Sequence, residues 1–369
     1  MEKSSVNKTY RAIGLMSGTA MDGIDGALIE TDGDDHIQTL GFVNQDHDDE
    51  IRDELRAQLN KGDFDTDVER QFTLAQLPIV QQLLDQCSLS FNDIEVIGFH
   101  GQTTHHDPDN GITVQMGDGQ LLANETGIDV VYDFRTNDMK NGGQGAPLIP
   151  VYHRALLQNA NVELPIAILN LGGVGNITWV SHDDMVAFDT GPANAMIDDW
   201  VAKQTDQKFD DGGQISSRGN VDEFTLNQFL SLPYFDKAYP KSLDRNDFQN
   251  ISVEGLLVED GAATLTEMTV QSVAMGIEIC PSKPTALYVT GGGRHNDYMM
   301  KRFADVTQLP IHSVDDLGWN GDAMEAEGFA YMAVRSLLNE PISFPNTTGC
   351  AQPLTGGVHV RAMKNRKTA

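Results

Sequence analysis

Short apolar runs separated by glycine-rich turns occupy the first third of the chain. The pattern predicts strands at residues 12–16, 24–30, 37–44, 94–99 and 128–133. After the third strand, apolar residues recur at four-residue spacing at Ile51, Leu55 and Leu59, which predicts an amphipathic helix. A second predicted helix has broader apolar faces and carries Phe72, Leu74, Leu77, Ile79, Val80, Leu83 and Leu84.

A second set of apolar runs repeats the beginning of the first. Strands are predicted at residues 166–171, 177–180 and 185–188. Their first turn contains Gly172, Gly173 and Gly175, and a helix begins at about Asn194. Either an α/β lobe has been duplicated or two unrelated hairpins share a pattern. We favour duplication, and a cleft between two lobes is a usual place for a ligand.

The C-terminal third adds two helices and a glycine run. A helix is predicted over residues 262–279, and a strand at 286–290 leads into Gly291, Gly292 and Gly293. Three glycines before a helix start leave backbone amides open to a nucleotide, although a flexible connection is the alternative. The last long helix is predicted over 322–339. Asp322 and Glu325 fall in its first turn, where carboxylates either favour the helix dipole or contact a ligand.

Length and composition suggest the domain organisation. At roughly 100–200 residues per domain, a chain of 369 residues with 40% hydrophobic residues is predicted to form two domains. We place an N-terminal lobe at residues 1–133 and a C-terminal lobe at 134–344, and we expect residues 345–369 to pack on the first lobe.

Charge and targeting signals narrow the partners. A formal net charge of −29 argues against binding to nucleic acid or to anionic membrane surfaces. The chain shows neither an apolar run of the ~20 residues that span a bilayer nor a secretory signal at its polar N-terminus. The cysteines Cys87, Cys280 and Cys350 are far apart and odd in number, which is typical of a reducing compartment. We expect a cytoplasmic protein.

The turn between the first two strands carries candidate chemistry. Gly18 and Gly23 allow close approach of a ligand, and Ser17, Thr19 and Asp22 add two hydroxyls and a carboxylate. Small residues, exposed amides and an acid suit a phosphate and its Mg²⁺. A plain β-hairpin with a polar turn is the alternative.

Other motifs are absent or ambiguous. The sequence contains neither a Walker-type phosphate loop nor a dinucleotide-binding fingerprint after the first strand. His105 and His106 are adjacent on an extended segment and would point to opposite faces, which disfavours a metal site. Asp189 is the best catalytic candidate: it ends a strand just before a helix and could take a proton from a hydroxyl or water. Its alternative role is a helix cap.

Taken together, these motifs resemble the anhydro-N-acetylmuramic acid kinase family, within the superfamily of actin, sugar kinases and Hsp70 ATPases. The resemblance runs nearly end to end, through residues 13–23, 98–103, 133–135, 142–148, 170–176, 189–194, 291–293 and 322–326. It implies a two-lobed, duplicated actin-like ATPase fold (ribonuclease H-like) with a cleft between the lobes. It also implies a homodimer.

The resemblance also implies a reaction. Enzymes of that family use ATP and water to convert 1,6-anhydro-N-acetylmuramic acid to N-acetylmuramic acid 6-phosphate, in the recycling of bacterial cell-wall sugars. By resemblance, Asp189 activates the water that attacks the anomeric carbon, which is half the logic of an inverting glycosidase. The expected cofactors are ATP and Mg²⁺, and Asp22 is the expected metal ligand.

The resemblance assigns further residues to binding. The ATP-binding segment covers Gly18, Thr19, Ala20, Met21, Asp22, Gly23, Ile24 and Asp25. We add six nucleotide-binding residues from the predicted C-terminal lobe, namely Gly172, Gly173, Asn176, Gly291, Gly292 and Gly293. The sugar is expected to contact Glu325, Gln102 and Arg135.

The chain departs from the family pattern at two places. Ala20 replaces the usual serine, so that one hydroxyl near the phosphates is lost while the backbone amide remains. Residues Leu243 and Asp244 interrupt the usual Ser-Thr-Gly-Arg run, which puts contacts of that loop in doubt. Two alternatives therefore stay open: a kinase of the same fold acting on another sugar, and an ATP-driven conformational module.

Overall fold

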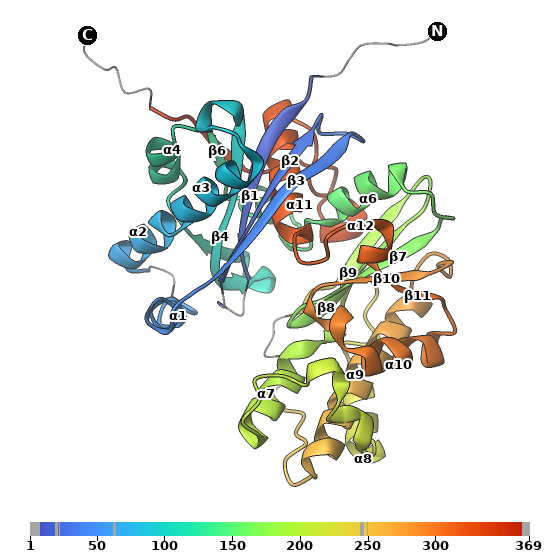
Figure 1. Ribbon diagram of the computed structural model, residues 1–369. Helices are drawn as coiled ribbons and strands as arrows, with labels where there is room; N and C mark the ends of the chain where they lie inside the picture. The colour runs from blue at the N-terminus through green and yellow to red at the C-terminus, as the bar shows by residue number, and fades with distance from the viewer. Residues whose placement is uncertain are drawn as a thin grey trace, which may run out of the picture. The chain divides into compact units, whose positions relative to one another are not determined.

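A computed structural model describes residues 8–363 except 19, 20, 22, 62, 63, 244–246 and 249. The described chain forms two compact units: Met1–Asn159 with Ala323–Ala369 is unit 1, and Ala160–Asp322 is unit 2. These limits differ from the sequence-based boundaries at residues 133 and 344, because two helices on either side of unit 2 in the sequence pack within unit 1. Figure 1 shows the elements of each unit.

Unit 1 is built on a mixed sheet with the strand order β12-β6-β4-β1-β2-β3, and β5 pairs with β4. Strands β1, β2 and β3 are antiparallel neighbours, whereas β4 runs parallel to β1 and β6 runs parallel to β4. The strands are β1 (Tyr10–Ser17), β2 (Gly23–Thr31), β3 (Ile37–Asp46), β4 (Val96–Asp107), β5 (Ile112–Met116), β6 (Val130–Tyr132) and β12 (Val358–Val360).

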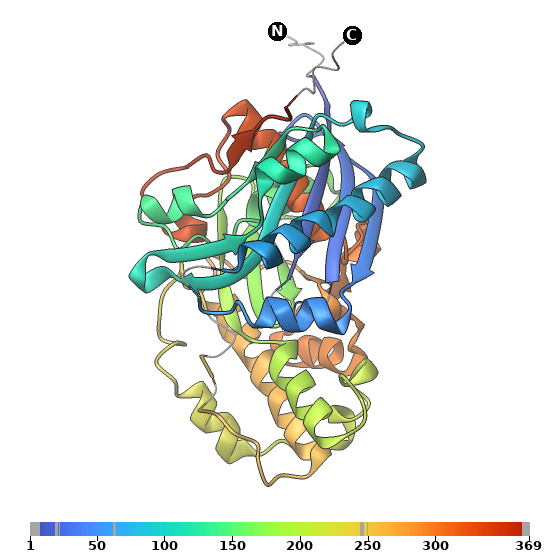
Figure 2. The same cartoon turned by 90° about the vertical axis from the view of Figure 1, so that its left-hand side faces the viewer.

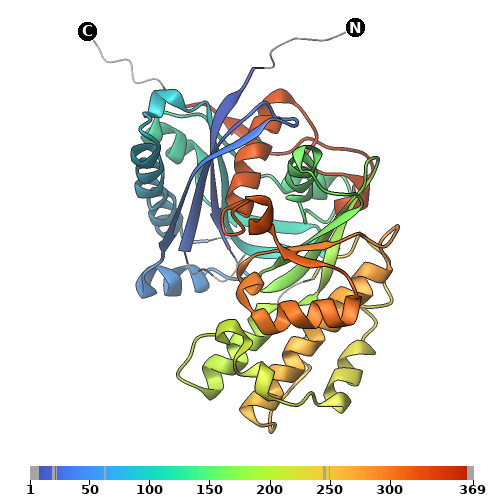
Figure 3. The same ribbon diagram turned by 45° about the vertical axis from the view of Figure 1, so that its right-hand side comes forward.

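Helices cover both faces of this sheet. Strand residues alternate between the faces, so Leu15 points into the core that includes Leu83 of α3, while Gly14 faces α11. Figure 3 shows α3 and α11 on opposite sides of the strands. The helices of unit 1 are α1 (Asp49–Arg56), α2 (Thr66–Leu74), α3 (Gln76–Cys87), α4 (Gly119–Thr126), α5 (Thr136–Lys140), α6 (Pro150–Asn159), α11 (Met324–Leu338) and α12 (Pro345–Thr348).

Unit 2 repeats the topology of unit 1. Its strand order is β11-β10-β7-β8-β9, with β7, β8 and β9 antiparallel and with β10 and β11 parallel to their neighbours. The order and the directions match β6-β4-β1-β2-β3 strand for strand. The strands are β7 (Ile166–Leu171), β8 (Val174–Val180), β9 (Met185–Pro192), β10 (Leu287–Thr290) and β11 (Ile311–Ser313). The α/β class and the predicted duplication are therefore confirmed.

The helices of unit 2 gather around a long central helix. Helix α9 contacts α7, α8, α10 and strand β9, and its buried residues, such as Leu265 and Val273, join the core of the unit. Figure 2 shows α7, α8 and α9 packed together. The helices are α7 (Asn194–Gln204), α8 (Glu223–Leu230), α9 (Val258–Glu278) and α10 (Asp297–Thr307).

Several predicted boundaries need correction. Helix α1 ends at Arg56, so Leu59 lies in the turn that follows, and α9 begins at Val258 rather than at residue 262. Helix α11 begins at Met324, which leaves Asp322 outside it. Strand β4 extends to Asp107 and pairs with the unpredicted strand β5. Among the described residues, every helix is too short or too polar to span a membrane.

Two glycines allow α11 to lie directly on the sheet of unit 1. A Cβ at Gly14 of β1 would stand 1.8 Å from the carbonyl oxygen of Ala326, and one at Gly98 of β4 would stand 2.2 Å from that of Phe329. Both neighbours are helix backbone, which cannot move aside as a flexible side chain could. Helix α11 therefore takes its depth against β1 and β4 from the absence of these two side chains.

We expect Gly14→Ala to destabilise unit 1 by about 1–3 kcal/mol or more, because the new methyl group overpacks the contact with α11. Thermal and denaturant unfolding measure the loss. Gly292→Ala is the control, since among the described atoms nothing lies within 4 Å of a Cβ there. Equal unfolding midpoints for the two variants would contradict the close approach of α11.

Candidate active site

The turn between β1 and β2 is held by Gln102 of β4. The Oγ atom of Ser17 lies 2.7 Å from Gln102 Oε1 and 3.0 Å from Gly23 O, and Gln102 Nε2 donates to Gly18 O at 3.1 Å. Gln102 has an exposed fraction of 0%. The structure therefore places this predicted sugar-binding residue as a buried support of the turn.

In the predicted ATP-binding segment, the described residues include side chains buried in the core and backbone that is open to a ligand. Met21 and Ile24 are 1% exposed and belong to the core of unit 1, so their side chains are turned away from any ligand. A Cβ at Gly18 would meet nothing among the described atoms within 4 Å, so backbone approach is open there. Thr19, Ala20 and Asp22, and with them the predicted metal ligand, lie outside the described residues.

Glu325 and Asp25 lie on the same side of the unit 1 sheet. Glu325 is half-buried in the first turn of α11, and Asp25 of β2 accepts a hydrogen bond from Asn44 Nδ2 at 2.8 Å. Burial and then the negative charge of Asp25 raise the pKa of Glu325, and the charge of Arg135 opposes the rise. These two carboxyl groups and one guanidinium, the charged cluster, thus influence one another electrostatically.

Two neutral acceptors hold Arg135. Its Nη1 donates to Gly145 O at 2.8 Å, and its Nη2 lies 2.9 Å from Nε2 of His100. The loop that presents Gly145 is itself tied down, because the buried Asp138 accepts from the Gly145 amide at 2.7 Å and from Thr348 Oγ1 at 2.6 Å. The guanidinium is therefore held by Gly145 and His100, and its charge acts on Glu325.

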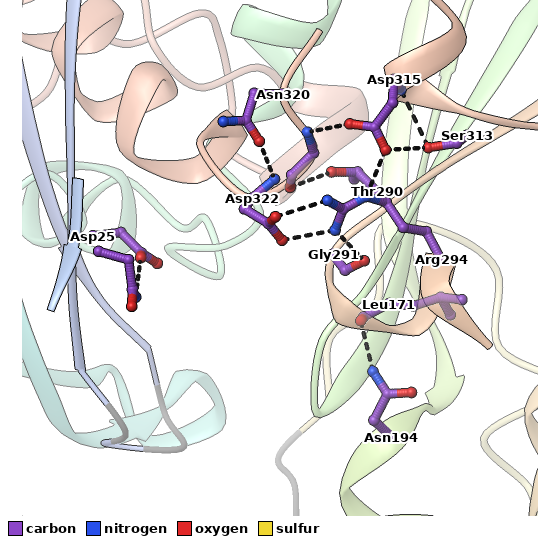
Figure 4. A network of polar contacts seen from close by, with 12 residues as sticks. Asp25, Leu171, Asn194, Thr290, Gly291, Arg294, Ser313, Asp315, Asn320 and Asp322 are labelled. Atoms are coloured by element: carbon purple, nitrogen blue, oxygen red, sulfur yellow. Dashed lines mark hydrogen bonds and ion pairs between the residues drawn. The ribbon is translucent and has the colours of Figure 1, made fainter. Parts of the chain in front are cut away.

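In unit 2, the turn between β7 and β8 accepts hydrogen bonds from the start of α7. The carbonyls of Gly172 and Gly173 accept from the amides of Asn194 (3.0 Å) and Ala193 (3.1 Å). Asn194 Nδ2 adds a bond to Leu171 O at 2.8 Å, which Figure 4 shows. A Cβ at Gly172 or Gly173 would meet its nearest atom at 3.8 or 3.5 Å, so this turn, like that at Gly18, leaves room for a ligand.

The three glycines after β10 differ in role. Gly291 has a φ of 77°, and a Cβ there would stand 2.6 Å from Asn170 Oδ1. A Cβ at Gly293 would stand 2.6 Å from Cβ of Leu171. A Cβ at Gly292 would face space that is open among the described atoms. Gly291 and Gly293 are thus needed for packing against β7, and Gly292 is left as the exposed approach.

Arg294 locks this glycine turn to the end of unit 2. Its Nη1 and Nη2 donate to both carboxylate oxygens of Asp322 at 2.7 and 2.8 Å, and its Nε donates to Asp315 at 2.8 Å (Figure 4). Although burial acts in the opposite sense, hydrogen bonds from Ser313 and Arg294 lower the pKa of Asp315 to about 2. Asp322, predicted to lie in the first turn of a helix, instead pairs with an arginine that sequence reasoning did not single out.

Asp189 sits on β9 in a row of polar side chains. It pairs across the sheet with Asn176 of β8, which in turn pairs with Asn170 of β7. Its Oδ2 accepts from the backbone amide of Leu243 at 2.7 Å, and its own amide donates to Lys241 O at 2.9 Å. The residue before α7 is Ala193, so the alternative role of Asp189 as the cap of that helix is not observed.

The loop beside Asp189 also presents a buried cation. Lys241 is 6% exposed, and its Nζ lies 4.5 Å from the ring centroid of Tyr234. Burial lowers the pKa of Lys241, with a contribution from the charge of Lys237. The hydroxyl of Tyr234 donates to the carbonyl of Asp189. Lys241 and Tyr234 thus surround the backbone of the catalytic candidate, and neither was identified from the sequence.

The described residues fit the binding of a nucleotide, and they do not include the expected metal ligand. Gly18, Gly172 and Gly292 offer open backbone, which is what phosphate binding requires. Within the described ranges, no three His, Cys, Asp or Glu side chains gather closely enough to hold a metal ion. The expected Mg²⁺ ligand Asp22 is outside those ranges.

Comparisons with known proteins assign the family. The family model described as "Anhydro-N-acetylmuramic acid kinase" matches residues 10–362. Proteins of that name from Rhizorhabdus wittichii and Zymomonas mobilis are 49% and 47% identical to this chain, and each alignment covers 94% of it and 98% of the relative. A solved structure, component A of (R)-2-hydroxyglutaryl-CoA dehydratase from Acidaminococcus fermentans, is remote: 11% identical over 89% of this chain and 99% of that chain, with a TM-score of 0.47. On the strength of the family model and the close relatives, the chain belongs to the anhydro-N-acetylmuramic acid kinase family.

Proposed function

We propose that the protein is an ATP-dependent kinase that opens 1,6-anhydro-N-acetylmuramic acid with water and phosphorylates O6. The products are N-acetylmuramic acid 6-phosphate and ADP, within the recycling of cell-wall sugars. Membership of the family along nearly the whole chain carries the proposal. The placement of Asp189, with its carboxylate oriented by the Leu243 amide, supports it.

The proposed reaction couples hydrolysis to phosphoryl transfer. A water oxygen bonds to the anomeric carbon as the bond from that carbon to O6 breaks, and Asp189 takes the proton of the water. The leaving O6 bonds to the γ-phosphorus, and ADP departs with the electrons of the broken P–O bond. Because the phosphoryl group captures O6, no second carboxyl group is needed to protonate it, in contrast to an inverting glycosidase.

We propose binding roles for the site residues, and the geometry within each unit supports some of them. We assign phosphate contacts in unit 1 to the open backbone at Gly18 and phosphate contacts in unit 2 to the open backbone at Gly172 and Gly292. Mg²⁺ would neutralise charge on the phosphates, and we retain Asp22 as its proposed ligand, because a carboxylate oxygen is a donor of the required kind. We assign the sugar to Glu325 and Arg135. Other residues complete the proposed sites, either by contact with a ligand or by support of the backbone that contacts it. They are Thr19, Ala20, Met21, Gly23, Ile24, Asp25, Gly173, Asn176, Gly291, Gly293 and Gln102.

Three further assignments accompany the proposed reaction: the cellular location, the oligomeric state and the class of substrate. A cytoplasmic location and a homodimer rest on the composition and on the family resemblance, and both stay predictions. The small-molecule substrate follows from the family. A kinase for another sugar and an ATP-driven conformational module are the alternatives to the proposed function.

Turnover in ¹⁸O-labelled water tests the proposed function. With ATP and the anhydro sugar, we expect ADP release that depends strictly on the sugar, and a product that carries ¹⁸O at the anomeric carbon. Equal ADP release with glucosamine-type sugars would favour a different sugar kinase, and release without sugar would favour a conformational module. A phosphorylated product without the label would refute the coupled hydrolysis.

We expect Asp189→Asn to lower turnover by roughly 10²- to 10⁴-fold, the usual contribution of a general base. The amide oxygen of asparagine can still accept from the Leu243 amide, so the loop and ATP binding should be preserved. Steady-state kinetics, ATP titration and thermal unfolding measure the three properties. Near-normal turnover would remove Asp189 from the mechanism.

We expect Gly292→Val to weaken ATP binding by roughly tenfold or more, the equivalent of about 1.4 kcal/mol, because the side chain fills the proposed approach of the nucleotide. Gly292→Ala should have a smaller effect, in proportion to its size. Unfolding temperatures should stay unchanged in both variants, since the position is open. If ATP affinity is unaffected by valine, the nucleotide does not approach Gly292.

A further inference from the structure

We infer that His100 is a positioning residue that acts through Arg135: its imidazole, neutral and protonated on Nδ1, holds the guanidinium in place as a hydrogen-bond acceptor. The inference rests on the proposed function for its kinetic consequences only. His100 lies on β4 within the segment that carries Gly98 and Gln102, and it was not among the residues that the sequence assigned to binding or catalysis.

The donor and acceptor roles follow from the chemistry of arginine. Arg135 Nη2 and Nε lie 2.9 and 3.3 Å from Nε2 of His100. A guanidinium has N–H donors and no acceptor, and it stays protonated in proteins. Nε2 must therefore accept with its lone pair, which leaves Nδ1 as the only ring nitrogen that can carry the proton of the neutral imidazole.

The surroundings of the ring favour this state. His100 is 4% exposed, and burial together with the charge of Arg135 holds the pKa of His100 well below its usual value. The backbone of Gly101 and Ser17 acts in the opposite sense, as acceptors of a ring N–H would. Nδ1 is buried, and among the described atoms it has no partner within normal hydrogen-bond geometry.

The ring is also set by packing. Its centroid lies 4.5 Å from that of Phe329 on α11, the residue whose carbonyl abuts Gly98. The imidazole is thus wedged between β4 and α11, with Nε2 turned to Arg135. Because α11 also carries Glu325, the same contact surface positions the backbone of Glu325 and, through His100, the guanidinium of Arg135.

A neutral acceptor has a specific advantage at this position. A carboxylate in place of His100 would also hold Arg135, but it would add a further negative charge to those of Asp25 and Glu325 and compete with any anionic group that Arg135 binds. Imidazole fixes the direction of the side chain and leaves its positive charge in place. That charge is the attractive feature for the acidic substrate of the proposed reaction.

Two amides of different length test the inference. Glutamine at position 100 can bring its side-chain oxygen near the place of Nε2, whereas the shorter asparagine cannot. We expect His100→Gln to keep the KM for the anhydro sugar close to the wild-type value and His100→Asn to raise it by roughly 10- to 100-fold, the effect of losing a hydrogen bond to a charged group. The KM for ATP should change in neither variant.

A double-variant cycle separates positioning from general damage. In an Arg135→Ala background, His100→Asn should add little to the KM for the sugar, because the group it positions is gone. Equal impairment by the glutamine and asparagine variants, or a full additional effect in the Arg135→Ala background, would overturn the inference.

A spectroscopic readout is independent of the proposed function. In long-range ¹H–¹⁵N correlation spectra of the histidine-labelled protein, with His100→Gln to assign the signal, His100 should show the Nδ1–H tautomer at neutral pH. An Nε2–H tautomer or an imidazolium would refute the inference whatever sugar the enzyme uses. If the tautomer is as expected and the anhydro sugar is not turned over, the proposed function fails and the positioning role stands.

Discussion

The sugar side of the proposed site depends on one packing constraint, the direct contact of α11 with the strands β1 and β4. Gly14 and Gly98 remove the side chains that would hold the helix away, and the backbone of Ala326 and Phe329 fills the space. Glu325 is one residue before Ala326, so its position over the sheet is inherited from this contact. His100 is held against Phe329 in the same interface, and Arg135 is held by His100.

The same sheet topology serves a different purpose in unit 2. There the polar row Asn170, Asn176 and Asp189 crosses the strands β7, β8 and β9. The glycine turn after β10 packs against that row at Asn170, and Arg294 Nη1 donates a hydrogen bond to the carbonyl of Gly291 in the same turn. Duplication therefore supplied two similar frames, and the side chains that line each frame give one unit the charged cluster and the other the proposed base.

Much of this arrangement could be predicted from the sequence, because strand periodicity and glycine turns are local signals. They located the strands β1, β2, β7 and β8 and suggested the repeat. The roles of individual glycines could not be predicted from the sequence. Gly292 and Gly293 are adjacent and chemically identical, but only Gly293 packs closely against Leu171. Gln102 and Asp322 were assigned to a ligand and to a helix, whereas their partners, Ser17 and Arg294, are far away in the chain.

The departure at Leu243 shows why a changed motif can preserve a site. The contact that orients Asp189 comes from the backbone amide of Leu243, and a second one joins the Asp189 amide to the carbonyl of Lys241. A backbone amide is common to threonine and leucine, so the substitution leaves this hydrogen bond intact. The hydrogen bonds to Asp189 depend on the path of the loop backbone past β9. The contact of the buried Lys241 ammonium with the ring of Tyr234 helps to fix that path. The position of the proposed base, Asp189, therefore does not depend on which side chain residue 243 carries.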